Sequence, residues 1–423
     1  MADAVPVNVA SLVTRNWQAA IRRDQHGRPT KDPGNAAIIL TNNDVWRGAL
    51  AYDEFNDRCY WASKAPVVPG LSQPIVGERF KDSHYLYVSH WFANHEGQSF
   101  AKTAVMDAMV AAAQANTHHP LQDYLDALVW DGTERLSTWL ATYLRCQDTD
   151  YTRRVGRWWL ISAVARALRP GCQVDHMLVL EGPQGRRKST ALRILGGDWY
   201  LGSLPSLRDE QKAAEAIQGK WICEAGELDA LRGAVATRTK NWITQLIDTY
   251  RPAYGRFPVD RPRSVVFAGT TNEHNYLNDP TGGRRYWPVG VGVIDAIALT
   301  EDRDQLWAEA VEAFRRGEHW WPDLEHQPMI ESEQEERHDV DAWEQRVRAW
   351  TNKHTDKDFT TGDVLGFALD IEPAKWDRAS QMRVGAVLRR LGFGNHRKRV
   401  DQNVLRVWRS AGSDPSGTGS VTS

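Results

Sequence analysis

Three short apolar segments, separated by helical segments, constrain the fold more than any other feature of the chain. They read MLVLEG from residue 177, WICEAGEL at 221–228 and SVVFAGTTN at 264–272. A short apolar run that ends at glycine or at polar residues is typical of a buried strand in a parallel sheet. Because strands that alternate with helices form βαβ units, we predict an α/β fold with a mainly parallel sheet.

Other segments of the chain have helical patterns, and one resembles a strand. Near the N-terminus, AAIILTNN resembles a helix, whereas YLYVSHWF at 85–92 resembles a strand. The remaining predicted helices cover 101–115, 121–128, 135–144, 152–168, 303–315 and 341–352.

Composition argues against several protein classes. The 423 residues include 52 Lys and Arg and 54 Asp and Glu, and a net charge of −2 gives no reason to expect a polyanion partner when it is averaged over the chain. The sequence contains no apolar run of about 18 residues, which is the length needed to span a membrane. The N-terminus does not resemble a secretory signal. The four cysteines are far apart, which argues against a zinc site and a disulfide framework. We therefore expect a reduced, cytoplasmic protein of several domains.

Local changes in composition divide the chain into six predicted regions. These are an accessory region at 1–100, a helical domain at 101–172, an α/β core at 173–322, an acidic linker at 323–344, a basic domain at 345–409 and a disordered tail at 410–423.

A glycine-rich segment, GPQGRRKS at 182–189, joins the first apolar strand to a helix. Glycines let backbone N–H groups surround phosphates, and the N-terminus of a helix favours negative charge. In such a loop the lysine contacts the β- and γ-phosphates of ATP and the serine binds Mg²⁺. The candidate nucleotide-binding residues are Gly182, Gly185, Lys188, Ser189 and Thr190.

One residue of this loop departs from the pattern. The position before the lysine is normally glycine, and here it is Arg187. Its side chain could strain the loop, point away from it or join the phosphates. The alternative interpretation is a basic turn between a strand and a helix that contains glycines by chance.

Two glutamates follow the second apolar strand, at the end where parallel sheets bind ligands. We predict Glu227 as the base that activates the attacking water and Glu224 as the acid on the Mg²⁺ side, although the sequence does not separate the two roles. The alternative is two glutamates on a solvated turn.

Polar residues also follow the third apolar strand. Asn272 can orient the attacking water, or it can cap the strand in an Asx turn. Arg284 and Arg285 lie further along, after two glycines, and one of them could reach the γ-phosphate bound by a neighbouring subunit. The alternative is a surface pair of arginines without a role.

Taken together, these motifs resemble the virulence-associated protein E family of phages, plasmids and pathogenicity islands. The resemblance covers 121–324 and is most specific in FAGTTNEHNYLNDPTGGRRYWP at 267–288. That family is similar to superfamily 3 helicases and to poxvirus-type primase-helicases. The resemblance implies a P-loop NTPase core, similar to superfamily 3 helicases and AAA+ proteins, that forms a ring, commonly a hexamer. It also implies ATP hydrolysis with Mg²⁺ and movement along DNA in a bacterial or phage-infected cell.

The same resemblance implies a role for each candidate residue. Lys188 and Ser189 take the Walker A role, and Glu224 and Glu227 take the Walker B role. Asn272 takes the sensor role, and Arg284 or Arg285 takes the role of arginine finger. The departure at Arg187 bears on the rate of hydrolysis more than on the fold.

The first candidate DNA-binding segment is 234–263, which has six basic residues and two acidic ones. Its second half combines arginines with aromatic rings, which can neutralise phosphates and stack on bases. In the helicases that the family resembles, this interval carries the pore hairpin. We therefore predict DNA contacts from Arg251, Tyr254 and Arg256; the alternative is an exposed hairpin with a solvated charged face.

The second candidate is the basic domain near the C-terminus. Residues 375–409 contain ten Lys and Arg against two Asp, a net of +8, whereas 323–344 contain nine acidic residues and one arginine, a net of −8. The pattern of helix at 360–369, helix at 381–391 and strand at 399–409 predicts a winged-helix-like domain that binds DNA. A basic domain docked on the acidic linker is the alternative. The candidate contacts are Arg389, Arg390, Arg397, Lys398 and Arg399.

The leading hypothesis is an ATP-dependent, ring-forming enzyme that moves along single-stranded or forked DNA during replication of a phage or other mobile element. The alternative is a DNA-binding initiation or regulatory protein with a degenerate nucleotide site, and a third, weaker possibility is an NTPase of the defence type. The first 100 residues have no paired-aspartate signature of a primase metal site, so a primase would be a separate partner.

Overall fold

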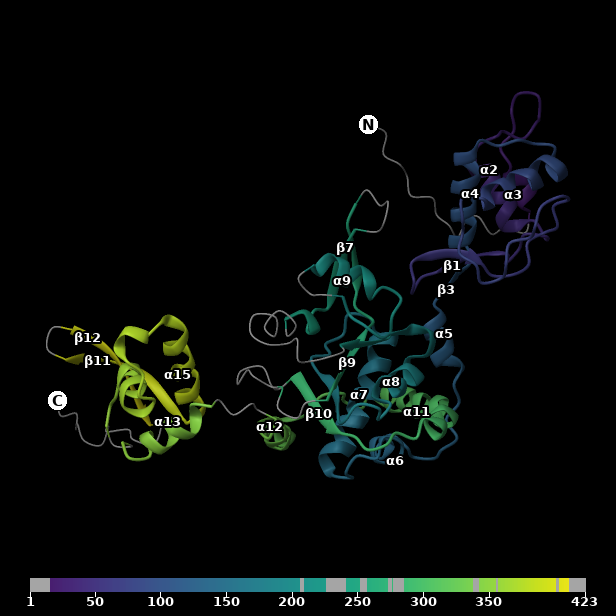
Figure 1. The fold of residues 1–423 in the computed structure, drawn as a ribbon. Helices are drawn as coiled ribbons and strands as arrows, with labels where there is room; N and C mark the ends of the chain where they lie inside the picture. The colour runs from purple at the N-terminus through teal and green to yellow at the C-terminus, as the bar shows by residue number, and fades with distance from the viewer. Residues whose placement is uncertain are drawn as a thin grey trace, which may run out of the picture.

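A five-stranded parallel sheet forms the centre of the molecule (Figure 1). All residues of β4 and β9 are buried, which explains why their sequences are nearly continuous apolar runs. The α/β fold with a parallel sheet is thus confirmed, and the three predicted strands lie side by side as β4, β9 and β6. In spatial order the strands are β10 (Tyr286–Gly290), β4 (Met177–Glu181), β9 (Val266–Thr271), β6 (Ile222–Ala225) and β5 (Tyr200–Leu201).

The structure is a computed structural model. It describes residues 16–205, 209–225, 241–251, 257–272, 276, 285–337, 342–354, 357–400 and 403–410. The tail predicted at 410–423 therefore lies outside the described residues except for Ser410.

Alternating side chains of β4 enter two different hydrophobic clusters. Leu178 and Leu180 belong to the larger cluster, whereas Met177 and Val179 belong to a smaller one that also contains residues of α9 (Glu210–Ala216). This alternation follows from the two-residue period of a strand. The larger cluster includes residues of α5 (Pro120–Ala127), α6 (Trp139–Leu144), α7 (Asp150–Leu168), α8 (Lys188–Gly196) and α11 (Ala296–Arg315).

Three fully buried tryptophans fix helices to their neighbours through their indole N–H groups. Trp159 of α7 donates to Phe267 O of β9 at 3.0 Å, and Trp221 donates to Ala163 O at 2.8 Å. Trp307 of α11 donates to the last turn of α8, at Leu195 O, over 3.1 Å. Buried indole N–H groups usually find such a partner, and these three contacts help to position the helices over the sheet.

The N-terminal part of the chain has a hydrophobic cluster of its own. Helix α4 belongs to this cluster and packs against α2 and β1, although we expected 101–115 in the helical domain that precedes the core. The described elements are α1 (Trp17–Ala20), α2 (Pro33–Asn42), β1 (Leu50–Asp53), β2 (Arg58–Trp61), α3 (His84–Trp91), the π-helical turn Phe92–Glu96, α4 (Lys102–Gln114) and β3 (Thr117–His118).

The strand predicted at 85–92 is wrong, because this segment is helix α3. Its buried residues His84, Tyr87, Val88 and Trp91 follow a spacing of three and four, which places them on one face of a helix. Aromatic and β-branched residues favour strands only weakly, and here packing against the N-terminal cluster overrides that preference.

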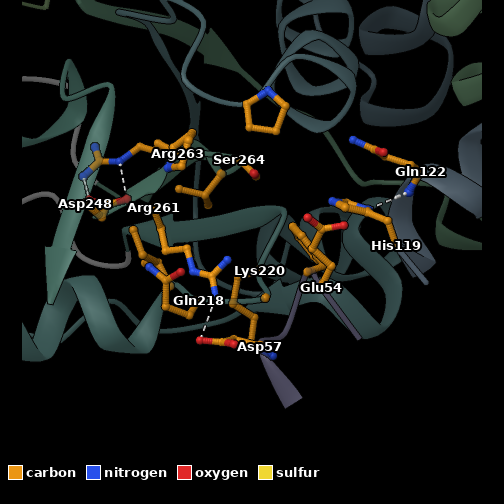
Figure 2. Close-up of a pocket in the computed structure, with 16 residues that line it drawn as sticks. Glu54, Asp57, His119, Gln122, Gln218, Lys220, Asp248, Arg261, Arg263 and Ser264 are labelled. Atoms are coloured by element: carbon orange, nitrogen blue, oxygen red, sulfur yellow. Dashed lines mark hydrogen bonds and ion pairs between the residues drawn. The ribbon is translucent and has the colours of Figure 1, made fainter. Parts of the chain in front are cut away.

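The N-terminal region contacts the core beside the hairpin of β7 (Ile247–Tyr250) and β8 (Val259–Pro262). Arg261 of β8 forms an ion pair with Asp57 at 2.9 Å and lies 3.4 Å from the hydroxyl of Tyr52. A cavity of about 230 Å³ lies at this boundary, with Glu54 and His119 on one side and Lys220 on another (Figure 2). Arg261 is therefore engaged within the chain.

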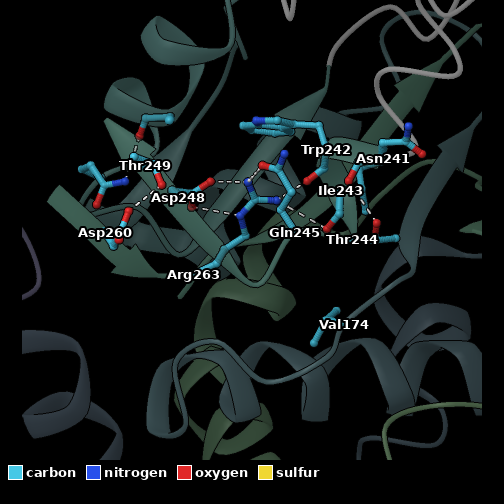
Figure 3. A network of polar contacts seen from close by, with 12 residues as sticks. Val174, Asn241, Trp242, Ile243, Thr244, Gln245, Asp248, Thr249, Asp260 and Arg263 are labelled. Carbon is cyan, nitrogen blue, oxygen red and sulfur yellow. Dashed lines mark hydrogen bonds and ion pairs between the residues drawn. The ribbon is translucent and has the colours of Figure 1, made fainter. Parts of the chain in front are cut away.

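Arg263, next to the hairpin, is fully buried and carries several polar contacts (Figure 3). Its guanidinium pairs with the buried carboxylate of Asp248, with one N–O distance of 2.9 Å, and also contacts Gln245 Oε1 at 3.1 Å. The guanidinium lies 4.5 Å from the ring centroid of Trp242. Because every one of these partners belongs to the core, Arg263 is a structural residue at the base of the hairpin.

The stretch expected as an acidic linker contains a packed helix, α12 (Gln327–Glu335), preceded by the short turn Leu324–His326. Ile330 and Gln334 of α12 are buried, and Gln334 donates to Tyr286 O of β10 at 2.7 Å. The next buried side chain, Arg337, pairs with Glu181 at 3.2 Å. This helix therefore binds the edge of the central sheet.

The C-terminal region consists of helices and an antiparallel hairpin around a fourth hydrophobic cluster. The predicted helices at 360–369 and 381–391 are present, but the single strand predicted at 399–409 is wrong, since that range covers the end of one strand and most of a second. The elements are α13 (Glu344–Thr351), α14 (Thr361–Asp363) continued by a π-helical turn at Val364–Ala368, the short turn Pro373–Lys375, α15 (Arg378–Arg390), β11 (Phe393–Val400) and β12 (Asn403–Ser410).

Among the described residues, no helix combines the length and apolarity that a bilayer crossing requires.

Replacing Arg263 by Gln should destabilise the core by about 3–5 kcal/mol, because it leaves the buried Asp248 carboxylate without its ion-pair partner. Thermal and urea unfolding followed by circular dichroism would measure the change. Arg316→Gln is the matched control, since its partner Glu312 lies one helical turn away on an exposed surface, where loss of the pair costs below about 1 kcal/mol. Equal effects of the two substitutions would contradict the structural role of Arg263.

Candidate functional site

The glycine-rich loop at 182–187 leaves the carboxyl end of β4 and enters α8. Gly182 has a φ of 148° and Gly185 a φ of 86°, which are conformations that favour glycine. A Cβ atom at Gly182 would also lie 3.1 Å from Val291 O, so a side chain would crowd the neighbouring strand. The glycines therefore allow a tight turn over the edge of the sheet.

Arg187 takes a left-handed backbone conformation with a φ of 67°, directly before the first residue of α8. A glycine would adopt this conformation without strain, whereas for an arginine it costs roughly 1 kcal/mol. The arginine side chain is exposed. Of the three possibilities given above for Arg187, the structure shows the side chain pointing to solvent. The backbone keeps the turn that a glycine would make.

The ammonium of Lys188 lies beneath the loop that precedes it. It donates to Gly182 O at 2.5 Å and Pro183 O at 3.1 Å. It also donates to Asn272 Oδ1 at 2.9 Å, across from the end of β9. Burial lowers the pKa of this lysine, and the nearby Glu224 carboxylate opposes that shift. Two residues that are 84 positions apart are thus brought together as predicted, because the parallel strands β4 and β9 end at the same edge.

Glu224, in β6, is the second polar centre of this edge, and only 2% of it is exposed. One carboxylate oxygen, Oε1, accepts hydrogen bonds from Ser189 Oγ and Thr270 Oγ1, each at 2.7 Å. The other oxygen, Oε2, accepts a hydrogen bond from the hydroxyl of Tyr200. Three hydroxyls from three different elements therefore surround one buried carboxylate.

Within the described residues, no group of three or more His, Cys, Asp and Glu side chains is arranged to hold a metal ion. The pair of Ser189 and Glu224 offers two neighbouring oxygens of the kind that hard cations prefer. Thr190 follows in the first turn of α8 and is partly buried.

A third polar centre lies one residue before the loop. Glu181 is buried and pairs with Arg337, and Tyr276 donates to its Oε1 at 2.8 Å. The Glu181 carboxylate is therefore committed to contacts within the chain, and it connects the start of the loop to the segment that follows α12.

Arg285 lies where the parallel strands begin, whereas the loop lies where they end. It directly precedes β10, whose first residue, Tyr286, pairs with Met177, whereas the loop begins at the other end of β4. The start of β4, beside Arg285, and the start of the loop are six strand residues apart. At about 3.3 Å per residue, this is roughly 20 Å, which exceeds the length of an arginine side chain. Arg285 and His176 line a cavity of about 460 Å³ there. The structure therefore does not bring Arg285 to the Lys188 of its own chain.

Several predicted site residues lie outside the described residues. These are Glu227, Arg284, Tyr254 and Arg256. Arg251, which is described, directly follows the last residue of β7.

The predicted DNA contacts of the C-terminal region have different surroundings. Arg390 is mostly buried and pairs with Glu344 at 3.3 Å, and Lys398 pairs with Asp358 at 2.7 Å. Lys398 and Arg409 together hold the pKa of Asp358 well below its usual range. The exposed Arg389 lies 5.9 Å from the ring centroid of Trp408. Arg397 is exposed on β11, the strand that also contains Arg399.

Sequence reasoning missed the hydroxyl partners of Glu224. Thr270 was part of the TTN motif, and its place at the end of an apolar strand could have suggested a role beside Asn272. Tyr200 had no comparable signal, because it lies in a two-residue edge strand that was not predicted. Neither was the partnership of Glu181 with Arg337 predicted, since it joins positions 156 residues apart.

Comparison with known proteins agrees with the resemblance found in the sequence. The family model for the virulence-associated protein E-like domain matches residues 125–339, just over half of the 423 residues. No curated protein matches the chain. Two structures of the NrS-1 C-terminal region, both in the A form and without ligand, have TM-scores of 0.46 and 0.45 to this chain. Each is 11% identical, and the match covers 90% of this chain and 100% of that one. Since the family model matches more than half of its length, this chain belongs to the virulence-associated protein E-like family.

Proposed function

We propose that this protein is an ATP- and Mg²⁺-dependent ATPase of the helicase type that moves along DNA during replication of a phage or another mobile element. The observation that carries the proposal is the convergence of Lys188, Asn272 and the Ser189–Glu224 pair at one edge of the sheet. They meet at a glycine-rich turn before the N-terminus of α8, where a P-loop NTPase binds phosphates.

Lys188 supports binding of the phosphates of ATP. Its ammonium is held by two carbonyl oxygens of the loop and the amide oxygen of Asn272, which are neutral partners. An anionic phosphate oxygen is a stronger acceptor for an ammonium than a neutral carbonyl is. The lysine can therefore exchange these contacts for the β- and γ-phosphates, and the Asn272 amide would then lie beside the reacting phosphate, in the sensor role.

The residues present fit a Mg²⁺ ion that is bound together with ATP. Ser189 and Glu224 would hold it, with phosphate oxygens and water as the remaining ligands. When bound, the ion neutralises charge on the phosphates. Because Glu224 is buried and accepts three hydrogen bonds, we assign it to the metal side and leave the role of general base to Glu227.

The position of Arg285 supports action between subunits. Arg285 lies about 20 Å from the glycine-rich loop of its own subunit, measured along the strand. It can therefore act as an arginine finger only at the nucleotide site of a neighbouring copy. We therefore propose a ring-shaped homo-oligomer, commonly a hexamer, in which Arg285 or Arg284 stabilises the transition-state charge next door.

DNA binding is assigned to two basic regions. The C-terminal region, with three helical segments before a β-hairpin, is compatible with a winged-helix domain, in which α15 and the hairpin contact the duplex. The exposed Arg389 and Arg397 are the best candidates there, since Arg390 and Lys398 have acidic partners within the domain. In the core we propose that Arg251, Tyr254 and Arg256, which lie between β7 and β8 in the sequence, contact a single strand of DNA. A separate primase remains a proposed partner.

A regulatory DNA-binding protein with a degenerate nucleotide site is the alternative. It was suggested by Arg187, yet the backbone there keeps a conformation that suits glycine, and the side chain is exposed. That observation favours a working loop.

Lys188→Ala should reduce ATP hydrolysis by at least about 100-fold, because the transition state loses its nearest cation. Phosphate release would be measured with and without single-stranded DNA, and DNA binding by fluorescence anisotropy should be unchanged. Lys212→Ala, which removes an exposed lysine of α9, is the control and should hydrolyse ATP normally. Undetectable turnover by the wild-type protein under both conditions would instead favour the regulatory alternative.

Arg187→Gly should stabilise the protein by about 1 kcal/mol, since it relieves a left-handed conformation at an exposed arginine. We expect a higher unfolding temperature and ATP hydrolysis at least equal to that of the wild type. A lower unfolding temperature would mean that the Arg187 side chain makes a stabilising contact that outweighs the strain.

The double variant Arg284→Ala, Arg285→Ala should be inactive alone and should regain part of its activity when mixed with Lys188→Ala subunits. Mixed interfaces can combine an intact loop from one subunit with an intact arginine from the next. The measurement is ATP hydrolysis across mixing ratios, with exchange of subunits verified by mass measurement in the presence of ATP and DNA. Absence of recovery in subunits that do mix would refute action between subunits.

A further inference from the structure

We propose that Tyr200 and Thr270 are positioning residues that hold Glu224 for the binding of the divalent cation. The inference rests on the proposed function, because it assigns a task to residues next to the Mg²⁺ side of that site. Neither residue would touch the ion or the nucleotide; both would act through the Glu224 carboxylate.

The two hydroxyls approach Glu224 from opposite neighbours in the sheet. Thr270 belongs to β9 and donates to Oε1 at 2.7 Å, whereas Tyr200 belongs to the edge strand β5 and donates to Oε2. Strand β6, which carries Glu224, lies between β9 and β5. Each oxygen of the carboxylate is therefore held from one side, so that the plane and the direction of the carboxylate are both fixed.

Burial makes these contacts necessary. Glu224 is 2% exposed and Thr270 8% exposed, so water does not replace a hydroxyl that is lost. No lysine, arginine or histidine among the described residues forms an ion pair with Glu224. The Lys188 ammonium interacts electrostatically with this carboxylate without forming an ion pair with it, so the carboxylate relies on hydroxyl donors, and hydrogen bonds to a charged group are the stronger ones.

The arrangement leaves Ser189 able to bind a cation. Because the carboxylate accepts, the Ser189 hydroxyl is the donor of its 2.7 Å contact with Oε1. A hydroxyl that donates its proton keeps its lone pairs as acceptors. If Tyr200 and Thr270 were absent, the carboxylate could turn away from Ser189, and the oxygen that orients this hydroxyl would be lost.

The tyrosine hydroxyl can be removed without removing the packing of the ring. The ring of Tyr200 lies near Gly196 and Gly202, and the guanidinium of Arg193 lies 5.9 Å from its centroid. None of these contacts involves the hydroxyl of Tyr200 as a donor.

The test measures the affinity of Mn²⁺, a spectroscopic substitute for Mg²⁺, in the full-length protein saturated with ADP. Electron paramagnetic resonance reports free and bound Mn²⁺. Tyr200→Phe and Thr270→Val should each weaken Mn²⁺ binding by about tenfold, as is typical when a group that orients a metal ligand is removed. Binding of ADP without metal should not change, and the Mg²⁺ concentration for half-maximal ATP hydrolysis should rise by a similar factor.

Two controls separate positioning from packing. Tyr143→Phe removes a similar tyrosine–carboxylate hydrogen bond, to Asp302 at 2.8 Å between α6 and α11, and should bind Mn²⁺ like the wild type. Thr270→Ser keeps the hydroxyl and should restore the affinity that Thr270→Val loses. If Tyr200→Phe fails to fold, the comparison of Thr270→Ser with Thr270→Val still tests the positioning role.

Wild-type Mn²⁺ affinity in Tyr200→Phe and Thr270→Val would overturn the inference while leaving the proposed ATPase intact. Equal loss in Thr270→Ser and Thr270→Val would overturn it as well, because packing would then explain the effect. Failure of the wild-type protein to bind ADP at all would reject the proposed function, and the inference with it.

Discussion

The parallel register of β4 between β9 and β10 is the constraint on which the rest of the candidate site depends. It brings the loop before Lys188 and the end of β9 to one edge of the sheet, so that an ammonium and an amide meet at 2.9 Å. The same register carries Arg285 to the other edge, because β10 begins where β4 begins. Residues that lie close together in the family's most specific sequence motif, Asn272 and Arg285, are therefore separated by the length of a strand. A single subunit holds the phosphate side of the proposed site, and if Arg285 acts as the proposed finger, it would act in the site of a neighbouring copy.

Buried charges explain how this edge is kept in order. Glu181 ends β4 and Glu224 lies near the end of β6, with β9 between the two strands, and each glutamate is nearly inaccessible to water. Glu181 has an arginine partner, Arg337, whereas the donors to the Glu224 carboxylate among the described residues are hydroxyls. An ion pair fixes the strand before the loop and connects it to α12, and a set of neutral donors leaves a negative charge that a cation can approach. The two glutamates therefore differ in their partners. Glu181 has a structural role, and Glu224 has a role in the proposed chemistry.

The sequence predicted the buried strands, most helices and the loop, because these depend on local patterns: apolar runs, glycines at turns and residues that favour helices. It also assigned Lys188 and Asn272 to one proposed nucleotide site, and the structure brings the two side chains together because neighbouring parallel strands end side by side. Helix α3 was misread because aromatic content outweighed a three-and-four spacing in our interpretation. The edge strand that carries Tyr200 is only two residues long, and no period can be read from two residues. The buried partners of Glu181 and Arg263 are distant in sequence, and side-chain pairing over such distances leaves no mark on local composition.

Charge counted along the chain also differs from charge available to a ligand. Among the described side chains of 375–409, Lys375, Arg390, Lys398 and Arg409 have acidic partners within the C-terminal region. The basic segment of the core, 234–263, shows the same effect, because Arg261 pairs with Asp57 and Arg263 is buried against Asp248. An exposed pair such as Lys375 with Glu372 exchanges partners at little cost, whereas the carboxylate of Asp358 is held by Lys398 and Arg409 together. The positive surface open to a phosphate backbone is thus narrower than the count of +8 suggests, and it centres on exposed residues such as Arg389 and Arg397. A narrow surface of this kind supports contact with a short stretch of DNA at each subunit, which suits a ring whose grip is shared among several copies.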